Sequence, residues 1–215
     1  MNQPQLPRHL RRLLCIGGMT LTLLAPSLPT FADTPKPPVR RSVKVVAKSW
    51  QSKVMATMAK RLQRNLPQIK GTTLAKKKRN IPSQLWGKVN VVMVAFARSH
   101  QKTIKTWHPK AKKLTKSYPG LDYMIVPVMN GFARLFGGLI EGGMRKTYKS
   151  RRDQLRTLPL YYGRGKFEKG LKLRSTGKLV VVLTDRKGRV FWQRSGPATA
   201  SKLRSLRNAL NKLYR

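Results

Sequence analysis

Acidic residues are scarce in this chain. Its 215 residues include 47 Lys or Arg but only six Asp or Glu, which gives a formal net charge of +41. No carboxylate side chain occurs from Thr34 to Leu121. A chain with this charge repels itself, so its compact state needs counterions or an acidic partner nearby. The acids stand singly, at positions 33, 122, 141, 153, 168 and 185, so local spacing offers no carboxylate pair for general acid–base catalysis.

Cysteine is almost absent as well, since Cys15 is the only one. It lies within residues 1–32, where three arginines precede an apolar run over residues 13–24, followed by prolines and the small residue Ala32. This order predicts a cleaved secretory signal and a periplasmic or secreted protein. The run is too short for a membrane anchor, which needs about 20 apolar residues. A mitochondrial presequence is the alternative, although such segments are typically amphipathic.

Cleavage after residue 32 would leave a mature chain without any thiol. Disulfide bonds, cysteine nucleophiles and cysteine–metal sites are then excluded. Ser99 and His100 suggest a nucleophile and a base, but adjacent side chains on a helix do not face each other. A capping serine beside an exposed histidine is the expected arrangement. His100 and His108 match no recognised metal-ligand spacing. We therefore predict no metal, no cofactor and no enzyme, with a hydrolase using Ser99 or His100 as a weakly supported alternative.

The composition is that of a globular protein, with 40% hydrophobic residues, and the length suits one domain. Residues 33–41 are rich in proline and predict an extended linker. Apolar residues recur at every fourth position from Ser49 to Leu66 and predict a basic helix. Residues 70–80 are interpreted as a polar loop. We expect linker, helix and loop to occupy residues 33–80 and a folded domain to occupy residues 81–215.

The expected domain alternates between strand and helix patterns. The β-branched, apolar run over residues 89–96 predicts a strand buried on both faces. Further strands are expected over residues 122–129, where Pro127 indicates an edge or a bulge, and over residues 179–184 and 189–195. Asp185 and Gly188 predict the turn between the last two strands. A helix is expected after Ser99, with a kink or break at Pro109. A second helix is expected along an apolar stripe formed by Phe132, Leu135, Phe136, Leu139 and Ile140. Part of residues 145–157 and the residues from Pro197 or Ala198 onward are also expected to be helical. This order predicts an α/β fold with a central sheet covered by helices on both faces.

Two segments resemble those of a thioredoxin-like domain. The run from Leu179 to Trp192 is similar to the late hairpin of that fold, and residues 89–96 are similar to its central strand. A redox-active member would carry Cys-x-x-Cys after this central strand, where a helix N-terminus stabilises the thiolate. Here Ala-Arg-Ser-His-Gln stands at residues 97–101, and the proline expected before the late strand is replaced by residues 175–178, Ser-Thr-Gly-Lys. The resemblance therefore implies a thioredoxin-like domain without disulfide exchange.

Two further stretches resemble the assembly-factor family for the membrane sector of the mitochondrial ATP synthase, which has bacterial relatives. One is Gly-Met-Arg at residues 143–145 with Leu-Pro-Leu-Tyr-Tyr at residues 158–162, and the other is residues 183–192 with Ser195 and Gly196. The resemblance covers about residues 85–212. It implies a non-catalytic binding or assembly factor whose partner is a protein or a membrane complex. The mitochondrial factor works on the matrix side, so an exported relative would have a diverged role.

Basic residues also form two clusters that are candidates for binding an anion or a partner, although a solvated basic surface explains them equally well. They are Lys76, Lys77, Lys78 and Arg79 in the first cluster and Arg145, Lys146, Lys149, Arg151, Arg152 and Arg156 in the second. The alternative function is therefore a polyanion-binding protein for anionic lipid, surface polysaccharide or, less favoured after export, nucleic acid. The four tryptophans could stack on bases, but core packing is the preferred interpretation.

Two other features have structural or environmental explanations. The glycine pairs at residues 137–138 and 142–143 lack the context of a phosphate loop and are expected to mark close helix packing or a mobile segment. The basic surface itself has a third explanation that needs no partner. A surface with few carboxylates changes its charge little at low pH, so it would suit an acidic exterior.

Overall fold

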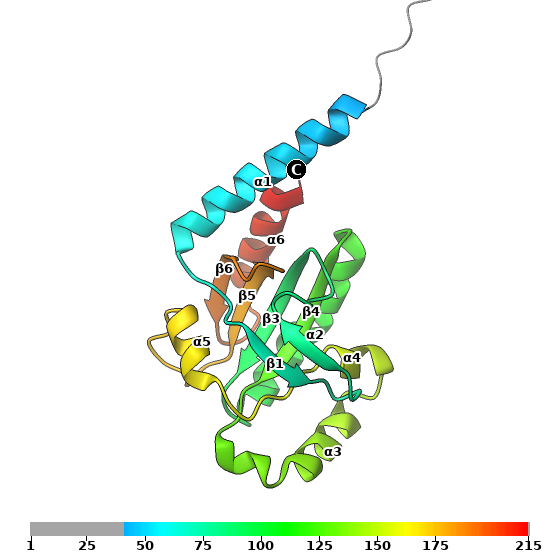
Figure 1. The fold of residues 1–215 in the computed structure, drawn as a ribbon, viewed down its shortest axis with the longest axis vertical. Coiled ribbons are helices and arrows are strands. Elements are labelled where there is room, and N and C mark those ends of the chain that lie inside the picture. The colour runs from blue at the N-terminus through cyan, green and yellow to red at the C-terminus, as the bar shows by residue number, and fades with distance from the viewer. Residues whose placement is uncertain (1–40, 215) are drawn as a thin grey trace, which may run out of the picture. The chain divides into compact units, whose positions relative to one another are not determined.

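The computed structural model describes residues 41–214, with side chains from Ser52 onward. The predicted signal over residues 1–32 and residues 33–40 of the predicted linker lie outside the described residues. The first described element is the helix α1 (Arg41–Leu62), which begins earlier and ends earlier than the predicted helix. The described residues, 41–214, belong to one compact unit (Figure 1). In the described part of the chain no helix is both long enough and apolar enough to cross a membrane.

A four-stranded sheet organises this unit. Its strands are β3 (Val89–Ala95), β4 (Leu121–Pro127), β5 (Val180–Asp185) and β6 (Val190–Ser195), in the order β4-β3-β5-β6. β4 is parallel to β3, whereas β5 is antiparallel to both β3 and β6. All four strands were predicted from the sequence. Pro127 ends β4 at the edge of the sheet, where its missing N–H costs no ladder hydrogen bond.

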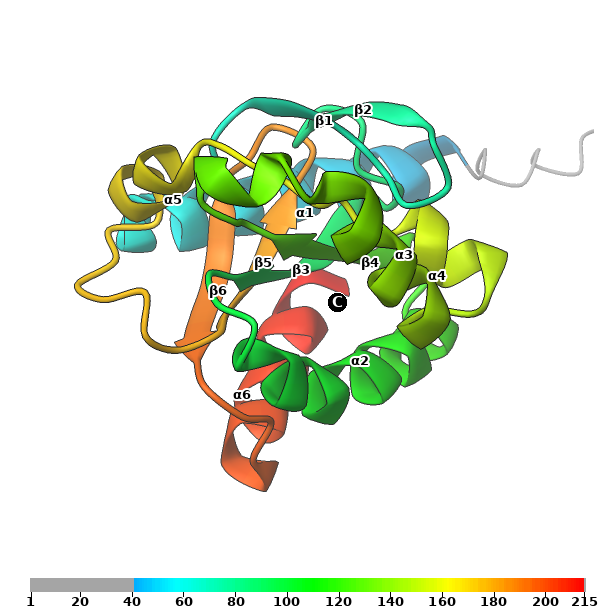
Figure 2. The same ribbon diagram turned by 90° about the horizontal axis from the view of Figure 1, so that it is seen from below.

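Both faces of the sheet are buried, which explains the nearly continuous apolar runs. Val91 and Met93 face one core, while Val92 and Val94 face the other, because successive side chains of a strand alternate. The first face is covered by α2 (His100–Ser117) and α6 (Ala200–Tyr214), as Figure 2 shows. Their buried residues include Trp107, whose ring contacts Trp192 edge-on at 6.0 Å. The predicted core role of these two tryptophans is confirmed.

The second face is covered by α5 (Arg164–Gly170) and by a hairpin of β1 (Ile69–Thr72) and β2 (Lys78–Ile81). The prediction of a polar loop over residues 70–80 is therefore wrong. Within the two strands only the isoleucines at the open end of the hairpin are buried, so the strands show no apolar alternation, while Leu74 and Ala75 are buried in the connecting turn. Leu66 and Ile69 belong to the same core cluster, so the core extends beyond the expected boundary at residue 81.

The predicted break of the helix at Pro109 is also wrong. α2 runs from His100 to Ser117 through Pro109. The proline is exposed, so water can reach the backbone carbonyl that loses its helical donor. Trp107 and Ala111, on either side, are buried against the sheet and hold both halves of the helix there.

Short helices connect β4 to the second half of the fold. They are η1 (Gly131–Arg134), α3 (Gly137–Thr147) and α4 (Arg151–Leu155). After α4 the chain runs along the outer edge of β4, where the N–H of Leu158 donates to the carbonyl of Ile125 and that of Leu160 to Pro127. The predicted Asp185 turn is confirmed, since its carboxylate accepts the N–H groups of Lys187 and Arg189 at 3.0 and 2.9 Å.

Candidate functional site at the carboxyl end of the parallel strands

The segments that follow β3 and β4 meet at one end of the sheet, because the two strands are parallel. The N–H of Val128 donates to the carbonyl of Ala95 at 2.7 Å and joins the two strand ends. In open α/β sheets, ligands bind beyond the carboxyl ends of the strands. Here this end carries the start of α2 and, after β4, the helices η1 and α3 at the lower end of Figure 1.

The start of α2 occupies the place where a redox-active thioredoxin domain holds its cysteines. Ser99 stands at the N-cap but makes no capping hydrogen bond with its side chain. His100 is buried, so the prediction of an exposed histidine is wrong. Its Nδ1 accepts the N–H of Phe96 at 3.2 Å, and its Nε2 has no hydrogen-bond partner in the described part of the chain. The geometry supplies a histidine that closes the turn into α2 and no serine–histidine pair.

The segment after β4 has an unusual surface. We call residues 131–147, which contain η1 and α3, the η1–α3 segment. Four of its large apolar side chains are exposed to solvent: Phe132 (81%), Leu135 (78%), Phe136 (61%) and Leu139 (80%). Neither η1 nor α3 contains a buried residue. The predicted helical stripe is thus divided between two helices and the turn that joins them, and only its fifth residue, Ile140, is half-buried.

Glu141 attaches α3 to the rest of the fold. Its Oε2 lies 3.1 Å from Lys76 Nζ and 3.7 Å from Arg145 Nη1. The hydroxyl of Tyr161 lies 3.3 Å from Glu141 Oε1 and 3.2 Å from the carbonyl of Gly137. Burial, with the nearby Glu141, raises the pKa of Tyr161 to about 12, so the hydroxyl stays protonated and can donate. The inner side of α3 is therefore polar, and the half-buried Met144 adds an apolar contact with the core.

The glycines of α3 differ in their packing. A Cβ atom at Gly137 would lie 3.1 Å from the hydroxyl of Tyr161, so this glycine does allow a close contact. A Cβ atom at Gly138, Gly142 or Gly143 would meet nothing within 4 Å, so these three do not mark close packing. Each glycine in a helix interior costs roughly 0.5–1 kcal/mol relative to alanine, so α3 is a weak helix.

The two predicted basic clusters are brought together at this end of the molecule. Lys76 from the first cluster and Arg145 from the second share the carboxylate of Glu141. Six of the ten predicted residues are exposed and form no ion pair within the described part of the chain: Lys77, Lys78, Lys146, Lys149, Arg151 and Arg152.

Arg79 and Arg156 play structural roles instead. Arg156 binds Asp122 in a bidentate pair, with Nε to Oδ1 at 2.7 Å and Nη2 to Oδ2 at 2.5 Å. The guanidinium of Arg79 lies 4.0 Å from the centre of the Trp86 ring, and that of Arg156 lies 5.1 Å from it. These are cation–π contacts. Because two guanidinium groups lie near the Trp86 ring, the ring is not free to stack on a nucleic-acid base. The side chain of Trp50 lies outside the described residues.

A buried carboxylate fastens α4 to α2 and to β4. Asp153 accepts hydrogen bonds from the hydroxyls of Ser150, at 2.7 Å, and Tyr123. Its carboxylate also lies 3.1 Å from His108 Nε2 and 3.4 Å from Lys112 Nζ. His108 is therefore engaged by a carboxylate. Within the described residues no three His, Cys, Asp or Glu side chains gather as a metal site.

The contacts of Asp153 explain the titration of the group. Burial alone would raise the pKa of Asp153, but the hydrogen bonds from Ser150 and Tyr123 and the nearby His108 and Lys112 lower it to about 2. The pKa of Tyr123 is raised by burial and by its hydrogen bond to Asp153. Burial, with the nearby Asp153, also raises the pKa of Tyr148 to about 12. The cluster is thus an ionised carboxylate held by neutral hydroxyl donors and cations, which is a structural arrangement.

The five acids that the structure describes all pair with basic residues. Besides Asp122, Glu141 and Asp153, these are Glu168 with Arg164 and Asp185 with Arg189. The sequence analysis did not single out Tyr123, Glu141, Ser150 or Asp153 as a connected set. The scarcity of acids was the available signal, because each isolated carboxylate in so basic a chain will attract cations from distant segments.

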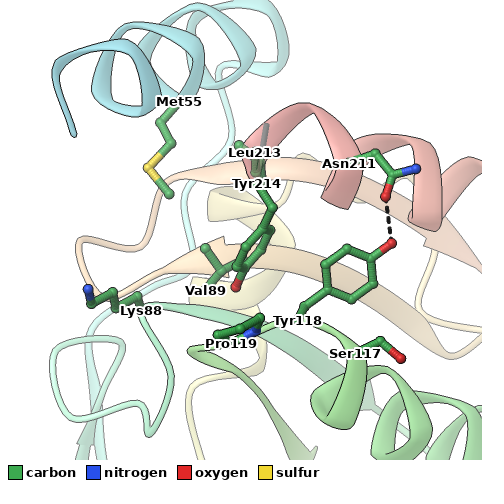
Figure 3. A pocket seen from close by; sticks show the side chains of 9 residues that line it. All are labelled: Met55, Lys88, Val89, Ser117, Tyr118, Pro119, Asn211, Leu213 and Tyr214. Carbon is green, nitrogen blue, oxygen red and sulfur yellow. Dashed lines mark hydrogen bonds between the residues drawn. The ribbon is translucent and has the colours of Figure 1, made fainter. Parts of the chain in front are cut away.

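A cavity of about 580 Å³ lies at the other end of the sheet, near the start of β3. The hydroxyl of Tyr118 donates to Asn211 Oδ1 at 2.6 Å beside it (Figure 3). Its lining holds one cation, Lys88, and neither a carboxylate nor a histidine: Met55, Lys88, Val89, Ser117, Tyr118, Pro119, Asn211, Leu213 and Tyr214. This lining offers no acid–base pair for catalysis.

Comparisons with known proteins agree with this arrangement. A family model described as "ATP10 protein" matches residues 57–213. Two similar structures from Aquifex aeolicus VF5, a putative electron transfer protein and a putative electron transport protein, each have a TM-score of 0.51 and 15% identity. They cover 71% of this chain and 97% and 98% of their own. A thiol:disulfide interchange protein of the thioredoxin family from Chlorobium tepidum TLS has a TM-score of 0.45 and 17% identity, over 69% of this chain and 97% of its own. No curated protein matches the chain. The predicted thioredoxin-like fold is confirmed.

Proposed function

This chain belongs to the ATP10 protein family, the ATP synthase assembly factors, and from this premise we propose that it acts by binding, without catalysis, during assembly of a membrane-bound ATP synthase. One observation carries the proposal. The sheet end that holds the redox cysteines of thioredoxin-like oxidoreductases has no thiol here and instead exposes the apolar η1–α3 segment. A large exposed apolar patch is typical of an interaction surface.

The geometry supports binding better than chemistry. Ser99 and His100 form no pair, and His108 is held by Asp153. Asp122, Glu141 and Asp153 each hold elements together through ion pairs. Most charged and large apolar groups exposed at this end are cations and apolar side chains, and the exposed Ser99 has no base beside it, so the arrangement suits surface recognition better than nucleophilic or acid–base catalysis.

Deletion of the protein in its own organism tests this function. We expect loss of intact ATP synthase on native gels and loss of ATP-driven proton pumping, both restored by the full-length chain. Full-length protein with an affinity tag should co-purify subunits of the membrane sector. Normal amounts of active ATP synthase in the deletion strain would refute an assembly role.

The lack of catalysis has a separate test, because Cys15 is the only cysteine. The Cys15→Ser chain should restore ATP synthase as fully as the unchanged chain does. A Cys15→Ser chain that is present at normal levels but fails to restore assembly would instead point to thiol chemistry.

We also propose that residues 1–32 direct export and are removed, with the positive start, apolar run and small residue before Asp33 as support. Mass spectrometry of the protein isolated from cells should find a mature N-terminus at Asp33 and a periplasmic or secreted location. An intact Met1 on protein found inside the cytoplasm would contradict export, and an import-dependent cut in a mitochondrion would favour the presequence.

Polyanion binding is the second candidate function. It is favoured by the convergence of the two basic clusters on Glu141, with six of their residues exposed and without an ion pair in the described part of the chain. Affinity for a polyanion such as heparin should then fall steeply as salt rises, because bound counterions are released. An affinity that does not change with salt would exclude this function.

A further inference from the structure

The outward side of the η1–α3 segment combines apolar and basic groups in a definite arrangement. Phe132 lies in η1, Leu135 and Phe136 lie in the turn between the two helices, and Leu139 lies in α3. All four are more than half exposed. Four large exposed apolar side chains within residues 132–139 form a local concentration, whereas single scattered ones would need no explanation.

The exposed charges around this patch are all positive, because the acids nearby point inward or are buried. Glu141, the one acid of α3, points inward to Lys76, Arg145 and Tyr161. Asp153, the next acid along the chain, is buried. The exposed charged residues of this stretch are all cations: Arg134, Lys146, Lys149, Arg151 and Arg152. The outer surface thus offers apolar side chains flanked by cations, without a carboxylate to repel an anion.

We propose that the η1–α3 segment is a membrane-surface element, which docks on an anionic bilayer with its four apolar side chains in the boundary between headgroups and acyl chains. Amphipathic segments that lie in this boundary carry Phe and Leu on one side and Lys or Arg on the other. The flanking cations then lie at the level of the anionic headgroups. No helix of the described part spans a membrane, so an attachment of this part would have to be made at the surface.

A bilayer fits this surface better than a groove on another protein does. A protein groove would need fixed acids opposite cations that come from η1, from α3 and from residues 149–152. Lipid headgroups move and match any such pattern. Gly138, Gly142 and Gly143 have open space around them, so the backbone of α3 can approach a flat surface closely.

This inference deepens the proposed function and rests on it for its biological setting, since assembly of a membrane complex takes place at a bilayer. The two can fail separately. Binding to pure lipid vesicles needs no ATP synthase, and restoration of ATP synthase in the deletion strain needs no particular lipid affinity.

The first experiment asks whether Leu139 enters lipid. In a Cys15→Ser background the full-length chain has no other thiol, so Leu139→Cys can carry a single polarity-sensitive nitrobenzoxadiazole label. Its emission should shift to shorter wavelength on vesicles of phosphatidylcholine with phosphatidylglycerol, and much less on phosphatidylcholine alone. The same label at the exposed Lys113→Cys on α2 is the control and should not shift.

Several outcomes would overturn the inference. One is a protein that sediments with the mixed vesicles while the label at residue 139 remains in water, which would mean that charges or the N-terminal apolar run make the attachment. Another is a shift of equal size on phosphatidylcholine alone. A third is a shift that needs the solubilised membrane sector of ATP synthase and does not occur with lipid, which would make a protein the occupant.

The second experiment separates the apolar and basic contributions by vesicle sedimentation of full-length variants. The combined change Phe132→Ser, Leu135→Ser, Phe136→Ser and Leu139→Ser should lower affinity for the mixed vesicles about tenfold or more. The change of Lys146, Lys149, Arg151 and Arg152 to Gln should weaken binding more than the same number of changes at the exposed α2 residues Lys102, Lys105, Lys113 and Lys116.

The N-terminal apolar run is present in every variant, so differences between variants report on the η1–α3 segment. Circular dichroism melts check that each variant folds, and Leu139→Ser alone replaces the fourfold change if that melt is lowered. Unchanged vesicle binding by a folded serine variant would refute the proposed surface. So would an equal loss of affinity from the four changes within residues 146–152 and from the four lysine changes on α2.

Discussion

Helices follow both parallel strands: α2 comes after β3, and η1 with α3 comes after β4. Both segments carry apolar residues at helical spacing. In α2 these residues, among them Ile104, Trp107 and Leu114, are buried against the sheet. In the η1–α3 segment the corresponding residues face water.

The difference between the two helices lies in what holds each one. α2 is fixed by apolar burial, and its Trp107 also donates from Nε1 to the carbonyl of Gly196 at 2.9 Å. α3 is fixed largely by the polar contacts of Glu141 on its inner side. An apolar stripe therefore marks a face that needs a cover, and the cover can be the protein's own sheet or something outside it.

The largest expected effect on stability comes from Trp107, which fixes α2 to the sheet. Trp107→Ala removes a fully buried side chain, its ring contact with Trp192 and its hydrogen bond to Gly196. We expect a loss of about 3–5 kcal/mol in the free energy of unfolding, because a large cavity forms in the core. Urea unfolding followed by circular dichroism measures it. A loss below about 1 kcal/mol, the size typical of an average substitution, would show that α2 is not fixed as described.

The Asp153 cluster, which ties α4 to α2, should have the next largest effect. Asp153→Asn keeps the shape of the side chain but removes the charge that His108 and Lys112 face and leaves Tyr123 or Ser150 with a weaker acceptor. We expect a loss of about 2–3 kcal/mol from hydrogen bonds to a charged group. Glu168→Gln, at an exposed pair on α5, is the matched control and should change stability by less than about 1 kcal/mol.

The same carboxylate gives a pH dependence. The pKa of Asp153 is about 2 in the folded protein against 3.8 for an unperturbed Asp. A lowered pKa means that the stabilisation is fully present above about pH 4 and is lost as the pH falls toward 2, by about 2 kcal/mol in total. Unfolding at pH 5 and pH 2 should show this loss in the unchanged protein and a smaller loss in Asp153→Asn. Equal losses in the two proteins would assign the acid sensitivity to other groups.

Glu141→Gln tests whether polar contacts hold α3 to the rest of the fold. The change weakens the contacts with Lys76 and Arg145, and because Lys76 is largely exposed the global cost should stay below about 1 kcal/mol. The local effect should be clear, since amide hydrogen exchange should accelerate in residues 137–147 and stay unchanged in α2. Unchanged exchange throughout α3 would mean that Glu141 is not its attachment.

The smallest effect on stability is expected at Leu139. Leu139→Ala should change the free energy of unfolding by no more than about 0.5 kcal/mol, because the side chain is already in water. Leu114→Ala on α2 is the matched change of the same residue type in a buried place and should cost about 2–4 kcal/mol. Similar costs at the two leucines would remove the distinction between the helices.

Much of the fold follows from local signals. The apolar runs predicted three strands of the sheet, and Asp185 with Gly188 predicted the turn and the returning fourth strand. Local signals failed where apolar residues were few or where packing overrode a breaker. The strands β1 and β2 have only Ile69 and Ile81 buried, and Pro109 lies within a helix that the core holds on both sides.

The candidate site was predicted less completely. The ten basic residues were identified, but Arg156 is engaged by Asp122 on β4, which is 34 positions away, and Arg79 by Trp86 in the loop before β3. The buried place of His100 was missed, because the pairing of its Nδ1 with the N–H of Phe96 depends on how the turn before α2 folds. Such pairings depend on tertiary geometry, and sequence spacing does not encode them.

The sequence by itself determined the scarcity of acids and thiols, and with it the lack of a cysteine pair at the start of α2. It also determined the four strands of the central sheet, since continuous apolar runs and turn residues are local properties of the chain. Only the tertiary structure decided that the stripe of α2 is core and that of the η1–α3 segment is surface. It also decided that Lys76 and Arg145 meet at Glu141. Burial and ion pairing depend on which distant segments come together, and the sequence gives no direct measure of that.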